Sequence, residues 1–397
     1  GGSIDFATLG NTGLAGQTIA EVYEANGASA IWSNVIKYVG AGAIATGGVI
    51  SLLKSLPLII KTFAGAMKSL KNTSGGTNVR TDRDLKMPVV LGIILIVIIL
   101  IWLVPSVPVS LLGAFLIAIF GFFFATVSSR MVGLIGSSNN PVSGMAIATL
   151  LISTFVLKAT GNTGMAGMTG AIAIGSIICV IAAIAGDTSQ DLKTGFIVGA
   201  TPAKQQVGEL IGVVASGFAI AGVMSLLNKA WGFGSAEIPA PQATLMKMIV
   251  EGIMDAKLPW VLVFMGVFLA LALEVLRVPV MPFAIGLYLP IYLSCGIMVG
   301  GVVRLFLDKK KEAEAKKKEM ISNGTLYCAG MIAGEGLVGI LMAVLAIIKV
   351  GDNSIGAIIG GLFNLSGAAG NIVGLIVLAL MILSLLKFSV WSKTKSK

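Results

Sequence analysis

The stretch VVLGIILIVIILIWL at residues 89–103 decides the fold, because every residue in it is apolar or glycine. A helix needs about 20 mostly apolar residues to cross the hydrocarbon core of a bilayer, and this stretch reaches that length with its flanks. Comparable runs occur at residues 113–127 and 261–273. Continuous runs of this kind are typical of membrane helices, whereas membrane barrels show alternating segments of about ten residues.

The composition of the whole chain agrees with this reading. Of the 397 residues, 56% are hydrophobic and 12% are charged, which is about half the charged fraction of a soluble domain. Histidine is absent from the sequence, which excludes imidazole metal sites and His-dependent nucleophiles. The net charge of +10 comes from basic residues between the apolar runs, where they set orientation. We therefore expect no cofactor and no nucleic-acid partner.

We predict an all-α, polytopic helical membrane protein of the cytoplasmic membrane, with about 9 to 11 spans. The predicted spans are 28–52, 88–104, 108–127, 142–160, 165–185, 206–228, 258–276, 278–304, 322–348 and 356–386. The predicted organisation is an extracytoplasmic segment 1–27, membrane helices within 28–304, a charged cytoplasmic linker 305–320, C-terminal membrane helices 321–386 and a cytoplasmic tail 387–397.

The basic segments restrict how the chain can cross the membrane. Residues 54–87, the six lysines of 305–320 and the tail are all expected on the cytoplasmic side. All three segments can lie on the cytoplasmic side if 278–304 enters and leaves the membrane on that side. The three prolines of 278–304 favour such a discontinuous or re-entrant segment. A miscounted span elsewhere is an equally good explanation. The lysine-rich run 309–319 is interpreted as a solvated charged segment.

A short internal repeat occurs in the sequence. Residues 10–18 read GNTGLAGQT and residues 161–169 read GNTGMAGMT, so seven of nine positions agree. Both copies precede a segment that runs toward the cytoplasm in the predicted topology. A parallel structural repeat of the kind found in transporters would explain this agreement.

A polar segment, GDTSQDLKTGFIVGATPAKQQ at 186–206, separates two long apolar runs. We expect it to form a loop, either solvated or folded back into a cavity. Its candidate substrate- or proton-binding residues, with the acid that follows the segment, are Asp187, Asp191, Lys193, Lys204 and Glu209. The alternatives are an ordinary solvated connection and, for Glu209, a helix-start acid. An intramembrane aspartyl protease would need two aspartates on facing helices, so we expect no enzyme.

A lone acid, Glu335, lies within the predicted span 322–348. An acid at that depth is costly and is functional by default, as a proton carrier or a substrate anchor. The alternative is an acid held by a neighbouring side chain for packing. Glu274 and Arg277 lie one helical turn apart and are predicted to pair with each other.

Three asparagines lie beside glycine-rich breaks: Asn139, Asn140 and Asn162. Their amides, with loosened backbone carbonyls, are candidates for binding a peptide-like substrate, as half-helix ends do in transporters. Helix capping is an equally good interpretation.

The segment GDTSQDLKTGF-(x)3-ATP-x-KQQ resembles the signature loop of the oligopeptide transporter family, which includes the yellow-stripe-like metal-chelate carriers. Supporting matches lie at 30–57, 137–151, 278–294 and 333–341, and the resemblance is greatest to bacterial members. Ala203 stands where we expect a bulkier or basic residue. Full-length members carry further spans before the matched region, so the chain resembles their C-terminal part.

The resemblance implies a secondary active transporter, coupled to protons, that moves oligopeptides, glutathione-like molecules or metal chelates. No Walker-type phosphate loop occurs in the sequence, which favours an ion gradient as the energy source. The implied partners are the substrate, protons and the bilayer, with homo-oligomerisation left open. The alternative is a truncated, non-transporting scaffold or a channel-like protein.

Overall fold

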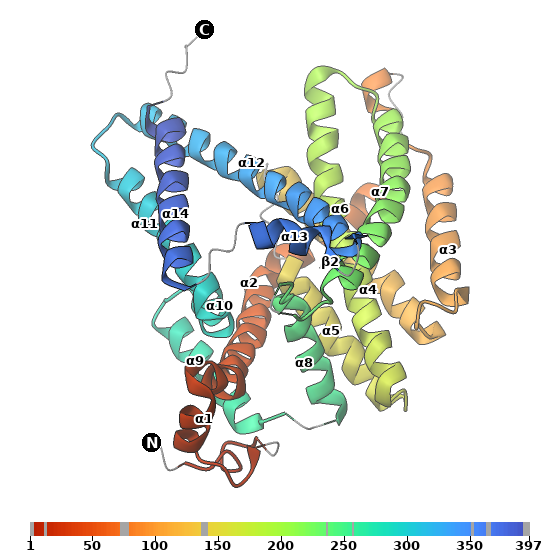
Figure 1. Cartoon of the computed structure of the whole chain (residues 1–397). Helices are drawn as coiled ribbons and strands as arrows, with labels where there is room; N and C mark the ends of the chain where they lie inside the picture. Colours follow the sequence, from red (N-terminus) through yellow and green to blue (C-terminus); the bar gives the residue numbers. More distant parts are fainter. Residues whose placement is uncertain are drawn as a thin grey trace. The chain divides into compact units, whose positions relative to one another are not determined.

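The computed structural model describes residues 4–11, 14–71, 79–135, 142–235, 237–255, 258–350, 353–362 and 367–391. Figure 1 labels the helices and strands of the chain. The chain divides into two compact units. Unit 1 contains residues 1–215 and 241–290, and unit 2 contains residues 216–240 and 291–397. Long helix α7 (Pro202–Ala230) begins in unit 1 and ends in unit 2.

Unit 1 is built from helices. Beyond the start of α7 they are α1 (Ile19–Ile31), the π-helical turn η2 (Trp32–Ile36), α2 (Lys37–Lys71), the 3-10 turn η3 (Arg80–Asp82), α3 (Met87–Leu103), α4 (Leu111–Ile135), α5 (Val142–Ala159), α6 (Gly164–Val198), α8 (Pro241–Asp255), α9 (Trp260–Val275) and α10 (Val280–Tyr288). Its core lies where α6 packs on α4 and α5, and where α2 packs on α9 and α10.

Helices α2 and α9 cross with their backbones in contact. A Cβ atom on Gly42 would lie 2.2 Å from the carbonyl oxygen of Val263, and one on Gly266 would lie 2.0 Å from that of Val39. Both glycines are therefore required by the crossing itself. Small residues have this role in membranes, where apolar helices gain little from leaving lipid and must gain from close packing.

Unit 2 is organised around α12 (Glu314–Ile347) and α14 (Gly367–Val390). The phenol of Tyr327 lies 2.7 Å from the Ser384 hydroxyl, and its ring stacks on that of Phe388. The Ser389 hydroxyl donates to the carbonyl of Met320 at 2.7 Å. Unit 2 also contains α11 (Ile291–Lys309), the antiparallel strands β1 (Lys349–Val350) and β2 (Asn353–Ser354), and α13 (Ile355–Leu362).

The prediction of an all-α, multi-pass membrane protein is confirmed. Among the described residues, seven helices are long and apolar enough to cross a membrane: α3 with its preceding turn, α4, α6, α7, α11, α12 and α14. Helices α5 and α9 are shorter apolar helices. The predicted break in 278–304 is present, because α10 ends at Tyr288 and α11 begins at Ile291, after Pro290. Whether this segment is re-entrant stays a prediction.

Several predicted boundaries are wrong. Helix α2 continues to Lys71, so it includes residues 54–71 that were assigned to a basic connection, and α12 begins at Glu314 within the predicted linker. Lysine and glutamate are good helix formers, so a helix continues past the hydrocarbon until a terminating residue stops it. Helix α8 was missed, since it is amphipathic and too polar for a span, although Leu245 and Ile249 on one of its faces are buried.

The predicted Glu274–Arg277 pair is also wrong. Glu274 forms an ion pair with Lys54 of α2, at 2.5 Å. Arg277 adopts a left-handed backbone conformation, with φ 59°, just after α9. The tight turn that follows α9 turns Arg277 off the helical face that carries Glu274.

We predict that Gly266→Ala destabilises the protein by about 1–3 kcal/mol, because the added methyl group overlaps the Val39 carbonyl oxygen. Thermal unfolding in detergent measures the effect. Gly92→Ala on α3 is the matched control, since no atom lies within 4 Å of its built Cβ, and alanine is the better helix former there. Equal stability of the two variants would contradict the backbone crossing.

Candidate functional site

The polar segment 186–206 is mostly helical, and the predicted loop is wrong. Helix α6 continues through it to Val198 and ends at Gly199, whose φ of 74° is left-handed. The amide of Ala200 donates to the Gly195 carbonyl at 2.7 Å, which closes the helix end. After Thr201, Pro202 begins α7 with the fixed φ that suits a first helical turn. The connection is therefore a tight turn between two long helices.

The structure does not gather the predicted charged residues into one pocket. Asp187, Asp191 and Lys193 lie exposed on the last turns of α6, and Lys204 is exposed on the first turn of α7. The Lys193 ammonium lies 5.8 Å from the ring centre of Phe196. Glu209, one turn further along α7, is the half-buried member of the set.

Gln205 locks the two helices together. A Cβ on Gly195 would lie 2.0 Å from the Oε1 atom of Gln205, so this glycine of α6 makes the room that the Gln205 side chain fills. The Nε2 atom of Gln205 donates to the Asp191 carbonyl at 3.0 Å. The contact fixes how α7 leaves the end of α6.

Residues 79–86, which we call the strap, fasten this turn to the start of α3. Arg80 donates from Nη1 to the Thr201 hydroxyl at 2.8 Å and from Nη2 to the Gly199 carbonyl at 2.7 Å. The Ala203 amide donates to the Arg83 carbonyl at 2.9 Å. The Arg80 guanidinium thus binds both the residue that caps the end of α6, Gly199, and the residue that precedes α7, Thr201.

Gln206 completes the attachment of the strap. Its Oε1 atom accepts from the Leu85 amide at 2.9 Å, and its Nε2 atom donates to Asp84 Oδ1 at 3.3 Å. The strap could not be predicted from the sequence, because its partners lie about 120 positions away in the chain. The only local indication is that Arg80 and Asp84 are charged and that Gln205 and Gln206 are consecutive amides.

A pocket of about 480 Å³ opens beside the strap, between α3, α6 and α7. Its polar end is formed by Asp84, Thr188, Gln206 and Glu209, and its walls are aliphatic. The Oε1 atom of Glu209 is buried and has no hydrogen-bond partner among the described residues. Two carboxylates and a carboxamide make this end rich in acceptors, so it suits a group that donates hydrogen bonds or carries positive charge.

Glu335 lies on α12 in unit 2 and lines a second pocket, of about 510 Å³. The other lining residues come from α11, α12 and α14, and are aliphatic side chains, glycines, methionines and Cys328. Among the residues described there, Glu335 is therefore the single charged group. The sequence-based expectation of an isolated acid within apolar helices agrees with this placement, and its role stays a prediction.

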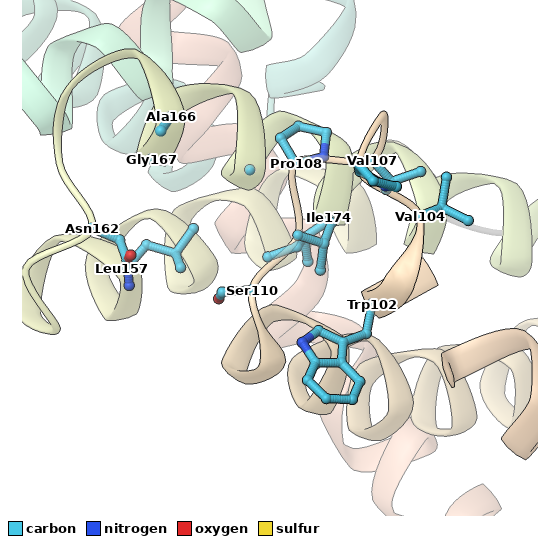
Figure 2. A pocket seen from close by; sticks show the side chains of 13 residues that line it. Trp102, Val104, Val107, Pro108, Ser110, Leu157, Asn162, Ala166, Gly167 and Ile174 are labelled. Atoms are coloured by element: carbon cyan, nitrogen blue, oxygen red, sulfur yellow. The ribbon is translucent and has the colours of Figure 1, made fainter. Parts of the chain in front are cut away.

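Asn162 lies at the other end of α6, about 37 Å along the helix axis from Asp187. It lines a pocket of about 350 Å³ with Trp102, Pro108, Leu157 and other residues (Figure 2). Its amide nitrogen donates to the Leu157 carbonyl at 2.9 Å, and its Nδ2 atom donates to the Thr160 hydroxyl at 3.2 Å. These bonds close the end of α5, as the capping alternative expects. Asn139 and Asn140 lie outside the described residues.

The two copies of the internal repeat share their backbone geometry at the first two positions. Gly10 and Gly161 are both left-handed, with φ 80° and 82°. In each copy the next asparagine amide, of Asn11 or Asn162, donates to the carbonyl five residues earlier at 2.9 Å. The following helices start at different points, after the first copy and within the second. The larger structural repeat stays a prediction.

A further polar feature, for which the sequence pattern gives no signal, lies in unit 1, where η2 joins α2. The Lys37 ammonium lies 5.7 Å from the ring centre of Trp32 and 5.9 Å from that of Tyr288. Trp32 donates to the Leu287 carbonyl at 3.3 Å, and the Tyr288 hydroxyl donates to the Pro241 carbonyl at 2.8 Å. Isolated π-helical turns are frequent at functional sites.

Comparison with known proteins gives a consistent result. Residues 11–346 match the family described as "OPT oligopeptide transporter protein". A Haemophilus influenzae protein named "Putative oligopeptide transporter" is 32% identical over 366 residues, covering 80% of this chain and 57% of that protein. The Arabidopsis thaliana "Probable metal-nicotianamine transporter YSL5" is 27% identical, covering 50% of this chain and 30% of that protein. No solved structure matches.

The chain spans little more than half the length of the Haemophilus relative. A Saccharomyces cerevisiae protein, "Putative oligopeptide transporter YGL114W", is 24% identical over 260 residues, and 34% of its length is covered. The matched region includes the α6–α7 turn, the strap and Glu335.

We predict that Arg80→Ala releases the strap, because it removes two charge-assisted hydrogen bonds to the α6–α7 turn. Faster hydrogen exchange at the Leu85 and Ala203 amides, measured by mass spectrometry, reports the release. Arg83→Ala is the matched control, since the strap uses the Arg83 carbonyl, which the substitution keeps. Equal protection of these amides in both variants would contradict the role of the Arg80 side chain.

Proposed function

The chain belongs to the OPT oligopeptide transporter family, and we propose that it carries out secondary active transport of peptide-like solutes driven by protons. The family is one of transporters and not of enzymes. The solute class is an oligopeptide or a peptide-like metal chelate, since relatives are named for oligopeptides and for metal-nicotianamine. The cell membrane is its site of action.

The observation that carries the proposal is that Glu335 is the one charged residue among the described residues that line its pocket. It lies exposed on a helix that is long and apolar enough to cross a membrane, where a fixed charge facing hydrocarbon is expensive. Proton uptake removes that charge, so the energy of the α11–α12–α14 pocket differs between the two protonation states. A carrier needs a group of this kind to link proton movement to its conformational cycle.

The strap pocket supplies a complementary binding function. Its acceptor-rich end, with the unpartnered Oε1 atom of Glu209, suits the ammonium group of a peptide or of an amino-acid-derived chelator. Its aliphatic walls suit the rest of such a molecule. We assign Asp187, Asp191, Lys193 and Lys204 to the exposed approach to this end of α6, and Asn162 to the pocket at the opposite end.

Uptake into proteoliposomes under an imposed pH gradient tests the proposal. We expect a labelled tripeptide or chelate to accumulate when the outside is acidic, and a protonophore to abolish the accumulation. If neither solute accumulates and the protonophore changes nothing, coupled transport by this chain is wrong. Accumulation that is insensitive to the protonophore would indicate another driving ion.

We predict that Glu335→Gln abolishes gradient-driven uptake but spares counterflow exchange, because the amide mimics the protonated acid and cannot release a proton. Glu319→Gln is the matched control, since it makes the same change near the charged start of the same helix. Unchanged gradient-driven uptake in Glu335→Gln would remove this residue from the coupling mechanism. Loss of both activities would make it a residue of solute binding instead.

A further inference from the structure

Basic side chains from three helices gather at one end of unit 2. Helix α11 ends at Lys309 and α12 begins at Glu314, so a short connection joins them. The bond from Ser389 to the Met320 carbonyl places the end of α14 beside the start of α12. We call the following residues the basic patch: Arg304, Lys309, Lys311, Lys317, Lys318 and Lys387.

The patch keeps an excess of positive charge. Residues 304–319 contain seven basic and four acidic side chains, a net charge of +3, and Lys387 brings it to +4. Glu312 is used twice, since it pairs with Lys316 at 2.9 Å and with Lys310 at 3.6 Å. The hydrogen bond from Lys316 lowers the pKa of the Glu312 carboxyl, so that this acid stays ionised.

The other lysines of the patch are not neutralised by ion pairs among the described residues. Lys309, Lys311, Lys317 and Lys318 form no ion pair with any residue that the structure describes. Three of these four are exposed, and Lys317 is partly exposed. The patch is therefore not neutralised from within unit 2.

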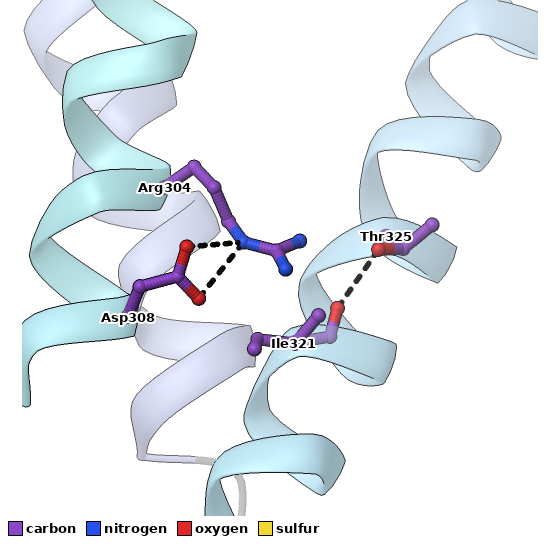
Figure 3. Close-up of polar contacts among 4 residues, drawn as sticks. All are labelled: Arg304, Asp308, Ile321 and Thr325. Carbon is purple, nitrogen blue, oxygen red and sulfur yellow. Dashed lines mark hydrogen bonds and ion pairs between the residues drawn. The ribbon is translucent and has the colours of Figure 1, made fainter.

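The guanidinium of Arg304 has a fixed orientation within the patch. Its Nε atom lies 3.1 Å from both carboxylate oxygens of Asp308, one turn further along α11. Figure 3 shows that this contact turns the guanidinium toward α12, where Thr325 donates to the Ile321 carbonyl. The two Nη groups have no partner among the described residues. Paired Nη groups match two oxygens of a phosphate.

The position of the patch at the ends of the helices favours a phospholipid headgroup over free phosphate as the ligand. Helices α11, α12 and α14 are long and apolar enough to cross a membrane, so we expect their charged ends to lie at the level of the lipid headgroups. Trp391, exposed just beyond Lys387, is of the type that lies at this level. A phosphate group is abundant at that depth as part of a phospholipid.

We infer that the basic patch binds the headgroup of an anionic phospholipid, with Arg304 holding the phosphate between α11 and α12 and the lysines supplying the surrounding positive charge. Basic pockets between membrane helices on the cytoplasmic side bind lipid headgroups in this way. The lysine-rich segments of the patch are the ones that we predict on the cytoplasmic side from their excess of basic residues. The inference is independent of what the chain transports.

Lipid-dependent thermal stability of the full chain in neutral detergent tests the inference. Dioctanoyl-phosphatidylglycerol is expected to raise the melting temperature with concentration, and dioctanoyl-phosphatidylcholine to leave it unchanged. The effect should weaken with added salt, because exposed charges are screened. Equal effects of the two lipids would overturn the inference. Reproduction of the effect by millimolar inorganic phosphate would also overturn it, because it would indicate a site for free anions.

Substitutions locate the site. Each basic group near an anionic surface is worth about fivefold in binding, so Arg304→Gln is expected to weaken the phosphatidylglycerol dependence by about that factor or more. Lys309→Gln, Lys311→Gln, Lys317→Gln and Lys318→Gln combined should nearly abolish it. Lys229→Gln, at an exposed lysine of α7 in the same unit, is the control and should behave as the unaltered protein.

The fourfold lysine variant keeps the test decisive if Arg304→Gln fails to fold, because its substitutions lie outside the core of unit 2. Full retention of the phosphatidylglycerol effect in that variant would overturn the inference. A loss of the effect in Lys229→Gln of the same size would do so too, since it would show a general response to charge.

Discussion

The backbone contact between α2 and α9 is the interaction on which unit 1 depends. Two apolar helices in lipid gain little from burying apolar area against each other, so they associate through close packing. Gly42 and Gly266 allow that approach, each against a carbonyl of the other helix. Lys37, which lies over the rings of Trp32 and Tyr288, and Lys54, which pairs with Glu274, are both residues of α2. The ion pair joins α2 to α9, and the contact of Lys37 with Tyr288 joins α2 to α10.

The sequence predicts the apolar helices well, because apolar length is a local property that the bilayer makes decisive. It predicts their ends poorly. Helix α6 continues thirteen residues past Ala185, and its end is set by the left-handed Gly199 and by the filling of the space at Gly195 by Gln205. That filling is a contact between two helices, and hydropathy along the chain contains no signal for it. Helix α8 was missed because its burial depends on neighbours that the sequence does not place.

The candidate site divides in the same way. The isolation of Glu335 could be predicted, because an acid within a long apolar run has few partners wherever the helices lie. The separation of Glu209 from Asp187, Asp191 and Lys193 could not, because helical rotation decides which residues of a polar segment face inward. The strap was missed for another reason: Arg80 and Gln206 act through backbone atoms far along the chain, and backbone atoms leave no mark in a sequence.

The strap also determines how α3 can move. This helix is held at its start by the bond between the Leu85 amide and Gln206 and at its end by the short connection to α4, and its own side chains are apolar and mostly exposed on every face. A sideways displacement of α3 would break one of these two attachments. Rotation about its long axis would only replace one apolar face of the helix by another. Rotation of α3 about its long axis would therefore change which aliphatic side chains line the strap pocket, while both ends of the helix stay attached.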